Sequence, residues 1–279
     1  MNKHHTAYIT LKKHDAYPWR ELHAGVKQCG DLTVAVWDPK TYDALSIAAT
    51  WNKYGTAARV ADQVKAAGGT HIVLENGYLR RDLGYYAIGL NGVNGKDDRK
   101  ILVRRPRRFR KLDIRIQPRH KGGRHILVIG QRGGGYNDMA MPNDWPEKII
   151  HEIRAITDRP IHYRPHPGRE RRPCSVPTGY REVSTKHPIA EALRGAHAAV
   201  VWTSNGATDA LIWGVPVFYC GPAIAIQEVA QRGIQNIETP AIWQEAHQVD
   251  ILQELAHRQF HISEIERGTA WRIMTGRYA

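Results

Sequence analysis

The chain has 279 residues, of which 42% are hydrophobic and 24% charged, a balance that is typical of globular proteins and excludes wholesale disorder. No apolar run approaches the roughly 20 residues that cross a bilayer, and the first residues lack the apolar segment of a signal peptide. The net charge is +13, and the three cysteines are far apart. We therefore expect a cytoplasmic protein without a membrane span, a disulfide framework or a zinc site.

The first part of the chain alternates short apolar strands with amphipathic helices. The predicted elements are a strand at 6–11, a helix at 17–30, a strand at 32–38, one or two helices within 40–69, and a strand at 70–82 that runs into a loop. This alternation favours a parallel sheet with helices on both faces. We assign residues 1–98 to an N-terminal α/β domain.

A strongly basic segment follows at residues 99–124. It holds 12 Lys and Arg residues against one acid, Asp113, so it carries +11 of the total charge of +13. Clustered Lys and Arg side chains gain by releasing counterions from phosphates, which indicates a polyanionic partner. A solvated linker is the alternative. The prolines and paired glycines of the basic segment predict that it connects two domains.

The second part of the chain repeats the strand–helix alternation. The predicted elements are a strand and glycine turn at 125–135, a helix at 145–157, a strand and loop at 160–167, a helix at 189–196, a strand–turn–helix–strand unit at 197–222, and helical segments at 242–274. We divide this part into an α/β domain, 125–245, and a C-terminal helical segment, 246–279. The predicted fold class is α/β, with two small doubly wound (Rossmann-like) domains facing a cleft.

Three strands of the second domain end in polar motifs. These are Gln131, Arg132 and Gly133; Arg164 and His166, the latter between two prolines; and Thr203, Ser204 and Asn205 at a helix start. Proline restricts its own backbone and that of the preceding residue, so the side chain of His166 is aimed rather than free. Since ligands of open α/β sheets bind at the carboxyl ends of strands, we expect the three motifs to form an anion site. Ordinary helix caps and surface loops are the alternative for each motif taken alone.

The order of these motifs resembles that of a known family. His166-Pro167, Thr203-Ser204, the strand "HILVIGQ" and the segment "TDALIWGVPVFYCG" resemble motifs of GT-B-type glycosyltransferases. The similarity is greatest to the capsule-polysaccharide, polysialyl- and CDP-glycerol-type transferases of bacteria. "VLENGYLRR" at 73–81 is similar to a further capsule-transferase stretch, whereas Asp209 stands where that family often has Glu. The resemblance covers about 125–230 and 70–81, and the basic segment has no counterpart in it.

The resemblance implies a nucleotide-sugar donor as co-substrate, and neither a cofactor nor a metal ion. Arg132, Arg164 and His166 would bind the donor phosphates, with His166 meeting the leaving group. The other residues implied at the donor are Gln131, Gly133, Thr203, Ser204, Asn205 and, at the ribose, Glu228. A base from the N-terminal half would deprotonate the acceptor hydroxyl, and the candidates are Asp15, Glu75 and His23.

The basic segment leads us to expect DNA as the acceptor. In this hypothesis the enzyme is of a phage type, works in a bacterial or infected-host cytoplasm, and glycosylates a hydroxymethylated base that is flipped out of the duplex. The residues expected to contact DNA phosphates are Arg104, Arg105, Arg107, Arg108 and Arg110. Two alternatives remain open: a capsule- or teichoic-type transferase acting on an anionic glycan, and a non-catalytic nucleic-acid-binding protein with a degenerate transferase fold.

Overall fold

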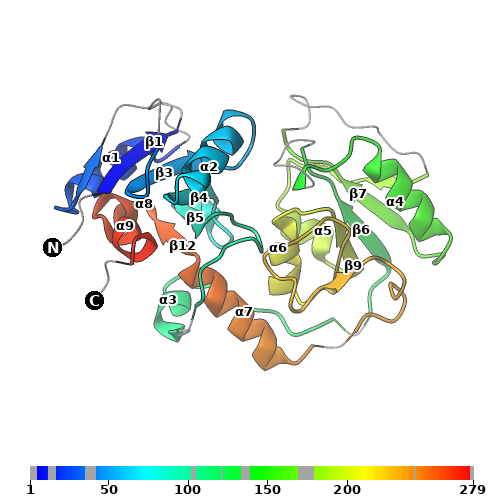
Figure 1. Ribbon diagram of the computed structural model, residues 1–279. Helices are drawn as coiled ribbons and strands as arrows, with labels where there is room; N and C mark the ends of the chain where they lie inside the picture. Colours follow the sequence, from blue (N-terminus) through cyan, green and yellow to red (C-terminus); the bar gives the residue numbers. More distant parts are fainter. Residues whose placement is uncertain are drawn as a thin grey trace. The chain divides into compact units, whose positions relative to one another are not determined.

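The protein folds into two compact α/β units. The computed structural model describes residues 5–11, 17–34, 42–101, 105–120, 122–132, 139–168, 179–241 and 243–276. Unit 1 comprises residues 1–104 and 254–279, and unit 2 comprises residues 105–253. Within the described residues each unit contains one six-stranded sheet, shown in Figure 1. The prediction of two Rossmann-like α/β domains is confirmed.

Unit 1 has the strand order β12-β5-β4-β3-β1-β2. Its strands are β1 (His5–Thr10), β2 (Leu32–Val34), β3 (Ser46–Trp51), β4 (Thr70–Asn76), β5 (Tyr85–Leu90) and β12 (Gln259–His261). The first four are parallel to one another, and β5 runs antiparallel between β4 and β12. The helices are α1 (Trp19–Lys27), α8 (Ile262–Glu266) and α9 (Thr269–Met274) on one face and α2 (Thr56–Ala66) on the other.

The core of unit 1 joins residues from the two ends of the chain. Trp271 of α9 is 1% exposed, and its indole N–H donates to the carbonyl of Leu22 at 2.9 Å. A Cβ at Gly25 would lie 2.2 Å from the carbonyl oxygen of Ile265, so glycine is required for α1 to approach α8 this closely. Residues 254–279 therefore complete a hydrophobic core that the first hundred residues begin.

Three strands of unit 1 differ from the sequence prediction. β3 lies inside the range 40–69, which we predicted as helix. The prediction was wrong there because the residues of β3 are buried on both faces and show no alternation of polar and apolar side chains. β5 falls outside every predicted element, and β12 interrupts the predicted helical segment 242–274. The three-residue β12 exists because it pairs antiparallel with β5, a tertiary contact that local sequence does not encode.

Unit 2 has an all-parallel sheet with the order β11-β10-β9-β6-β7-β8. Its strands are β6 (His125–Ile129), β7 (Ile161–Arg164), β8 (Arg181–Glu182), β9 (Ala196–Val201), β10 (Val217–Tyr219) and β11 (Gln231–Arg232). The helix α4 (Trp145–Arg154) packs on one face, and α5 (Ile189–Leu193) and α6 (Gly206–Ile212) lie on the other. The central strands β6 and β9 are buried throughout, as expected for a sheet covered on both faces.

The boundary between the units falls within the basic segment and again within a helix. The first division is at residues 104 and 105, inside the predicted linker 99–124, and this segment also forms the short helix α3 (Pro106–Arg110). The second division lies inside α7 (Glu245–His257). The predicted C-terminal segment 246–279 thus returns mainly to unit 1.

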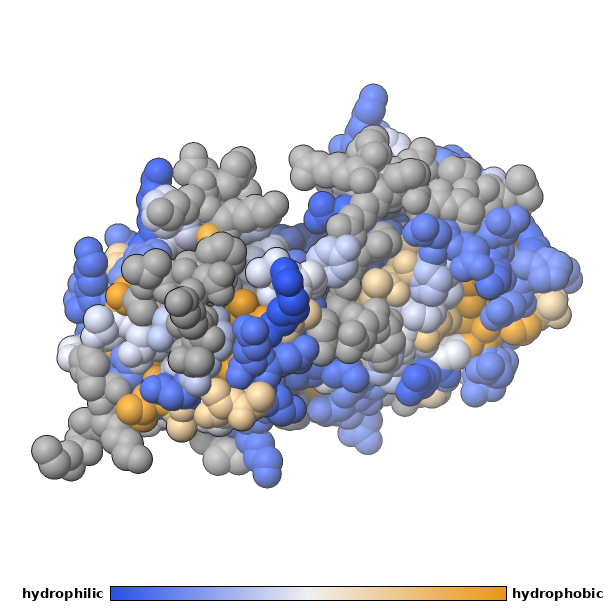
Figure 2. Space-filling view, turned by 45° about the horizontal axis from the view of Figure 1, so that its top comes forward, coloured by the Kyte–Doolittle hydropathy of each residue, from blue (hydrophilic) through white to orange (hydrophobic). Residues whose placement is uncertain are grey.

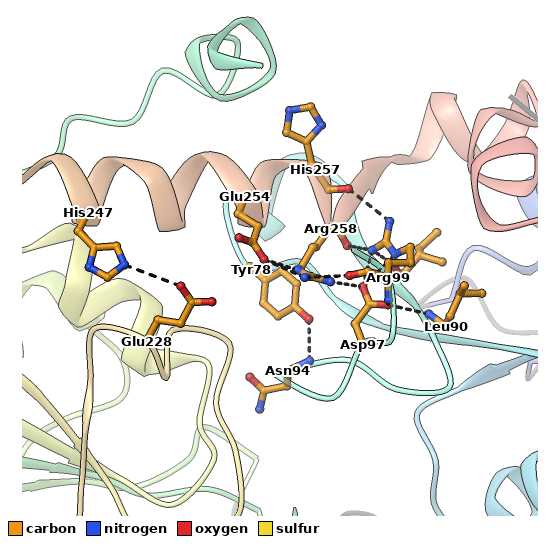
Figure 3. Close-up of polar contacts among 11 residues, drawn as sticks. Tyr78, Leu90, Asn94, Asp97, Arg99, Glu228, His247, Glu254, His257 and Arg258 are labelled. Atoms are coloured by element: carbon orange, nitrogen blue, oxygen red, sulfur yellow. Dashed lines mark hydrogen bonds and ion pairs between the residues drawn. The ribbon is translucent and has the colours of Figure 1, made fainter. Parts of the chain in front are cut away.

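A buried charged network ties the segment after β5 to the end of α7 within unit 1. Figure 3 shows Asp97, 3% exposed, between Arg99 and Arg258, with a nitrogen of each guanidinium 2.7 Å from its carboxylate. The other Asp97 oxygen accepts the backbone N–H of Leu90 at 2.9 Å. Arg258 also donates to Glu254 at 2.8 and 2.9 Å. Every charge here has an opposite partner, which is the condition for burying charges without a large penalty.

A buried histidine of unit 1 is held neutral. His71 of β4 is 1% exposed, and its Nε2 lies 2.9 Å from the hydroxyl of Thr50. That hydroxyl donates to the carbonyl of Asn52 at 2.7 Å, so the imidazole Nε2 is the donor in the first contact. Burial, together with the nearby charge of Lys53, lowers the pKa of His71 to about 4 from its ordinary 6.5.

This lowered pKa predicts a loss of stability in mild acid. Between pH 6.5 and 4 the unfolded chain binds a proton at His71 that the folded chain does not, so the free energy of unfolding falls as the pH falls. At pH 5 this proton binding is expected to lower the free energy of unfolding by about 2 kcal/mol. Urea denaturation at pH 7.5 and pH 5 should show a smaller decrease for His71→Gln than for the wild type. Equal decreases in the two proteins would contradict the prediction.

Candidate functional site

The three predicted strand ends of unit 2 lie side by side. In the sheet, Ile129 of β6 pairs with Arg164 of β7 on one side and with Val201 of β9 on the other. The residues that follow these three strands therefore leave the sheet at one edge. Strand β6 also lies where the strand order reverses, since the chain proceeds to β7 on one side and to β9 on the other. Such a switch point is where open α/β sheets bind ligands.

A side-chain bridge crosses this switch point from β6 to β9. The side-chain oxygen of Gln131 accepts from the backbone N–H of Thr203 at 3.1 Å and lies 3.0 Å from its hydroxyl. The amide nitrogen of Gln131 donates to the carbonyl of Met139 at 3.3 Å. A Cβ at Gly221 would lie 2.4 Å from Thr203 Cγ2, so glycine lets the chain after β10 pass close to this bridge. Gln131 fixes the loop after β9 relative to β6.

Replacing Gln131 by leucine should loosen this edge of the sheet. The variant keeps the approximate volume but leaves the buried Thr203 amide without its acceptor, which costs about 1–3 kcal/mol. The free energy of unfolding, measured in urea, is expected to fall by this amount. Gln63→Leu, on the exposed surface of α2, is the matched control and should change stability by less than about 0.5 kcal/mol. Equal effects of the two substitutions would show that the bridge contributes nothing.

Arg132 and His166 come together around Gly168. A Cβ at Gly168 would lie 3.5 Å from His166 Nδ1 and 3.6 Å from Arg132 Cδ, so both side chains lie against this glycine. The backbone N–H of Gly168 donates to His166 Nδ1 at 2.9 Å. In the neutral imidazole the proton therefore lies on Nε2, which makes that nitrogen a hydrogen-bond donor. The loop after β7 thus presents an oriented imidazole, and the side chain of Arg132 from the loop after β6 lies against the same glycine.

Arg164 has a different place from the one that sequence predicts. It is 7% exposed, and its guanidinium donates to the carbonyls of Ser184 at 2.6 Å and His187 at 2.7 Å. Burial lowers the pKa of Arg164, while the charges of Asp209 and Glu191 oppose that shift. These contacts hold the connection between β8 and α5 against the end of β7.

The polar residues before α6 make local contacts. Ser204 Oγ accepts from the backbone N–H of Gly206 at 3.2 Å, and Asn205 Oδ1 accepts from the hydroxyl of Thr208 at 3.1 Å. These bonds agree with the alternative that such residues shape a helix start. Glu228, in the loop after β10, instead lies 3.8 Å from His247 of α7, as Figure 3 shows.

Of the base candidates and the arginines predicted to contact DNA, only some lie within the described residues. Glu75 is the penultimate residue of β4 and half-buried, and His23 of α1 meets Trp19 edge to face at 6.1 Å. Asp15, Gly133 and Arg104 lie outside the described residues. Four arginines of the basic segment belong to α3 or the residue before it, namely Arg105, Arg107, Arg108 and Arg110, and all but Arg108 are largely exposed.

In the described ranges no three His, Cys, Asp or Glu side chains gather as metal ligands. None of the described helices is long and apolar enough to cross a membrane. The face drawn in Figure 2 is mostly hydrophilic, with smaller groups of hydrophobic residues between the charged ones.

Two glycines and a main-chain carbonyl of this site were not predicted from the sequence. A Cβ at Gly221 would crowd Thr203, Gly168 lies in contact with His166 and Arg132, and Met139 supplies a carbonyl to the Gln131 bridge. The glycines are visible in "HPG" and "YCGP", directly after two predicted strand ends. Main-chain acceptors such as Met139 leave no trace in a sequence.

Comparison with known proteins identifies the fold. Neither a protein-family model nor a curated protein sequence matches the chain. Its fold is similar to that of a solved β-Kdo 2,4 transferase, KpsC of Thermosulfurimonas dismutans, with a TM-score of 0.57, 15% identity and 90% of each chain covered. The chain shares the fold of this solved transferase. A β-Kdo 2,7 transferase, also KpsC from that organism, matches with a TM-score of 0.54 and 15% identity over 90% of this chain and 89% of the other.

Proposed function

We propose that the protein is a glycosyltransferase that moves a sugar from a nucleotide-activated donor to an anionic glycan. The single observation that carries the proposal is the meeting of Gln131, Arg132, His166 and Thr203 at the switch point of a sheet with a glycosyltransferase fold. Open α/β sheets bind nucleotides at this place. The two solved transferases to which the fold is similar are named as transferases of Kdo, an acidic sugar.

In the proposed reaction the anomeric carbon of the sugar loses its bond to a phosphate oxygen and forms one to the acceptor oxygen. Negative charge grows on the leaving phosphate, and Arg132 with the Nε2–H of His166 stabilises it electrostatically. Arg164 supports the site indirectly, because its guanidinium binds the carbonyls of Ser184 and His187 and so holds that loop against the end of β7. The acceptor proton goes to a carboxylate, for which Glu75 and Asp15 stay the candidates. We propose that no metal ion takes part, because basic side chains fill its role.

The exposed arginines of α3 favour a second candidate acceptor, DNA. Arg105, Arg107 and Arg110 form a basic surface that suits a phosphate backbone as well as a carboxylate-rich glycan. Transfer to a hydroxymethylated base is therefore kept as the second function. The fold similarity to Kdo transferases is what ranks the glycan first.

A donor panel tests the proposed function directly. Thermal shift with UDP-, GDP-, CDP- and CMP-activated sugars, CMP-Kdo included, should raise the melting temperature with one nucleotide class. Product analysis with an acidic oligosaccharide and with hydroxymethylated duplex DNA then separates the two acceptors. Stabilisation by none of the donors would reject the transferase in favour of a non-catalytic protein with this fold. Salt-insensitive or absent DNA binding in a shift assay would remove the second candidate.

A further inference from the structure

Aromatic side chains gather at the carboxyl edge of the sheet of unit 1. Trp51 is the last residue of β3, Tyr86 pairs with the last residue of β4, and Tyr17 precedes α1. The rings of Tyr17 and Trp51 meet edge to face with centroids 4.8 Å apart, and those of Trp51 and Tyr86 do so at 6.1 Å. We call these three residues the aromatic edge.

The aromatic edge is only partly buried. Its three side chains pack against the core of unit 1 yet keep part of their surface in solvent, whereas the aromatic core residues Phe260 and Trp271 are each 1% exposed. Core packing alone therefore does not account for three large rings at this position. Exposed aromatic surface at the ligand-binding edge of an open α/β sheet is typical of a recognition site.

Polar groups accompany these rings. Asn76 is exposed and pairs with Tyr86 across the strands, so the two residues lie on the same face of the sheet. Glu21 lies in the first turn of α1, the helix that Tyr17 precedes and that packs in the same cluster as Tyr86, and burial, then the charge of Glu21, raise the pKa of Tyr86. An amide and a carboxylate are the groups that bind vicinal hydroxyls.

We propose that the aromatic edge, with Asn76 and Glu21, binds a sugar ring of the acceptor. The apolar C–H face of the ring would stack on Trp51 or Tyr86, and its hydroxyls would bind Asn76 and Glu21. The proposal rests on the proposed transfer to a glycan. A nucleic acid fits this surface less well, because the edge-to-face rings form no parallel slot in which a base would stack.

Binding of defined saccharides to the full chain, without donor, tests this site. The probes for isothermal titration are a β-linked Kdo disaccharide and the neutral maltotriose. Trp51→Ala and Tyr86→Ala should each weaken binding about tenfold, while Trp51→Phe, which keeps an aromatic ring, should retain most of it. Far-ultraviolet circular dichroism checks that each variant is folded. Tyr42→Ala is the matched control, because Tyr42 is also half-buried and meets Tyr8 edge to face at 5.2 Å, but at another hydrophobic cluster. It should bind both saccharides as the wild type does.

Two results would overturn the proposal: no millimolar binding of either saccharide by the wild type, or unchanged binding by a folded Trp51→Ala. Stronger binding of single-stranded DNA than of the saccharides, lost in the same variants, would assign the surface to nucleic acid instead. Nucleotide-sugar binding to unit 2 is measured separately by thermal shift and should be equal in all variants. Its absence alongside saccharide binding by the aromatic edge would reject the proposed transferase and leave this site standing.

Discussion

His166→Ala is expected to lower kcat by about 10²–10³-fold, because a fixed donor to the leaving phosphate contributes this much to transition-state stabilisation. The imidazole is oriented by the Gly168 N–H, which binds Nδ1 at 2.9 Å and leaves the proton on Nε2. Alanine removes the donor together with its orientation. The measurement is the initial rate of transfer with the donor identified in the thermal-shift panel, at saturating donor and acceptor.

The control for this variant is a histidine of the same unit outside the site. His151, exposed on α4, should be replaceable by alanine without loss of rate. Both variants should keep the far-ultraviolet circular dichroism and melting temperature of the wild type, since His166 is half-exposed. A His166→Ala enzyme with wild-type kcat would contradict the assignment of this residue to the leaving group.

Asp97→Ala is expected to lower the free energy of unfolding by about 3–5 kcal/mol, the cost of removing one partner from a buried ion pair. The carboxylate is 3% exposed and lies 2.7 Å from nitrogens of Arg99 and Arg258. Without it two cations share a buried site, and among the described residues Glu254 remains as the acid paired with Arg258. The backbone N–H of Leu90 loses its acceptor as well. Urea denaturation followed by circular dichroism measures the change.

An exposed ion pair of the same unit provides the comparison. Asp82 lies 3.7 Å from Arg80 with 67% of its side-chain surface exposed, so Asp82→Ala should cost no more than about 0.5 kcal/mol. Similar losses for the two aspartates would mean that burial of the network adds nothing to stability.

The fold class was accessible from the sequence because the alternation of strands and helices is local. The strands β4, β6 and β7 lie within predicted ranges, and β1 and β9 each begin one residue before theirs. β3 was missed because a strand buried on both faces, "SIAATW", has no alternation of polar and apolar residues to distinguish it from a helix. β12 depends on pairing with β5, and that contact joins residues about 170 positions apart.

The candidate site was predictable to the level of strand ends but not of individual bonds. Parallel strands force Gln131, His166 and Thr203 to one edge, and the structure places them there. The contacts of Arg164 with the carbonyls of Ser184 and His187 could not be predicted from the sequence, because the path of a loop determines where its main-chain acceptors lie. Neither could the aromatic edge, whose three rings come from segments separated by 34 or more residues.

The return of the chain to unit 1 fixes an order of folding during synthesis. Unit 2 is continuous, so it can fold as soon as residue 253 has left the ribosome. The core of unit 1 needs Phe260, Ile265 and Trp271, which are translated later. The N-terminal part must therefore wait, with the apolar faces of β1, β3 and β4 on the α1 side still lacking the cover that α8 and α9 supply. Nascent chains that stall after unit 2 would consequently expose these faces to chaperones.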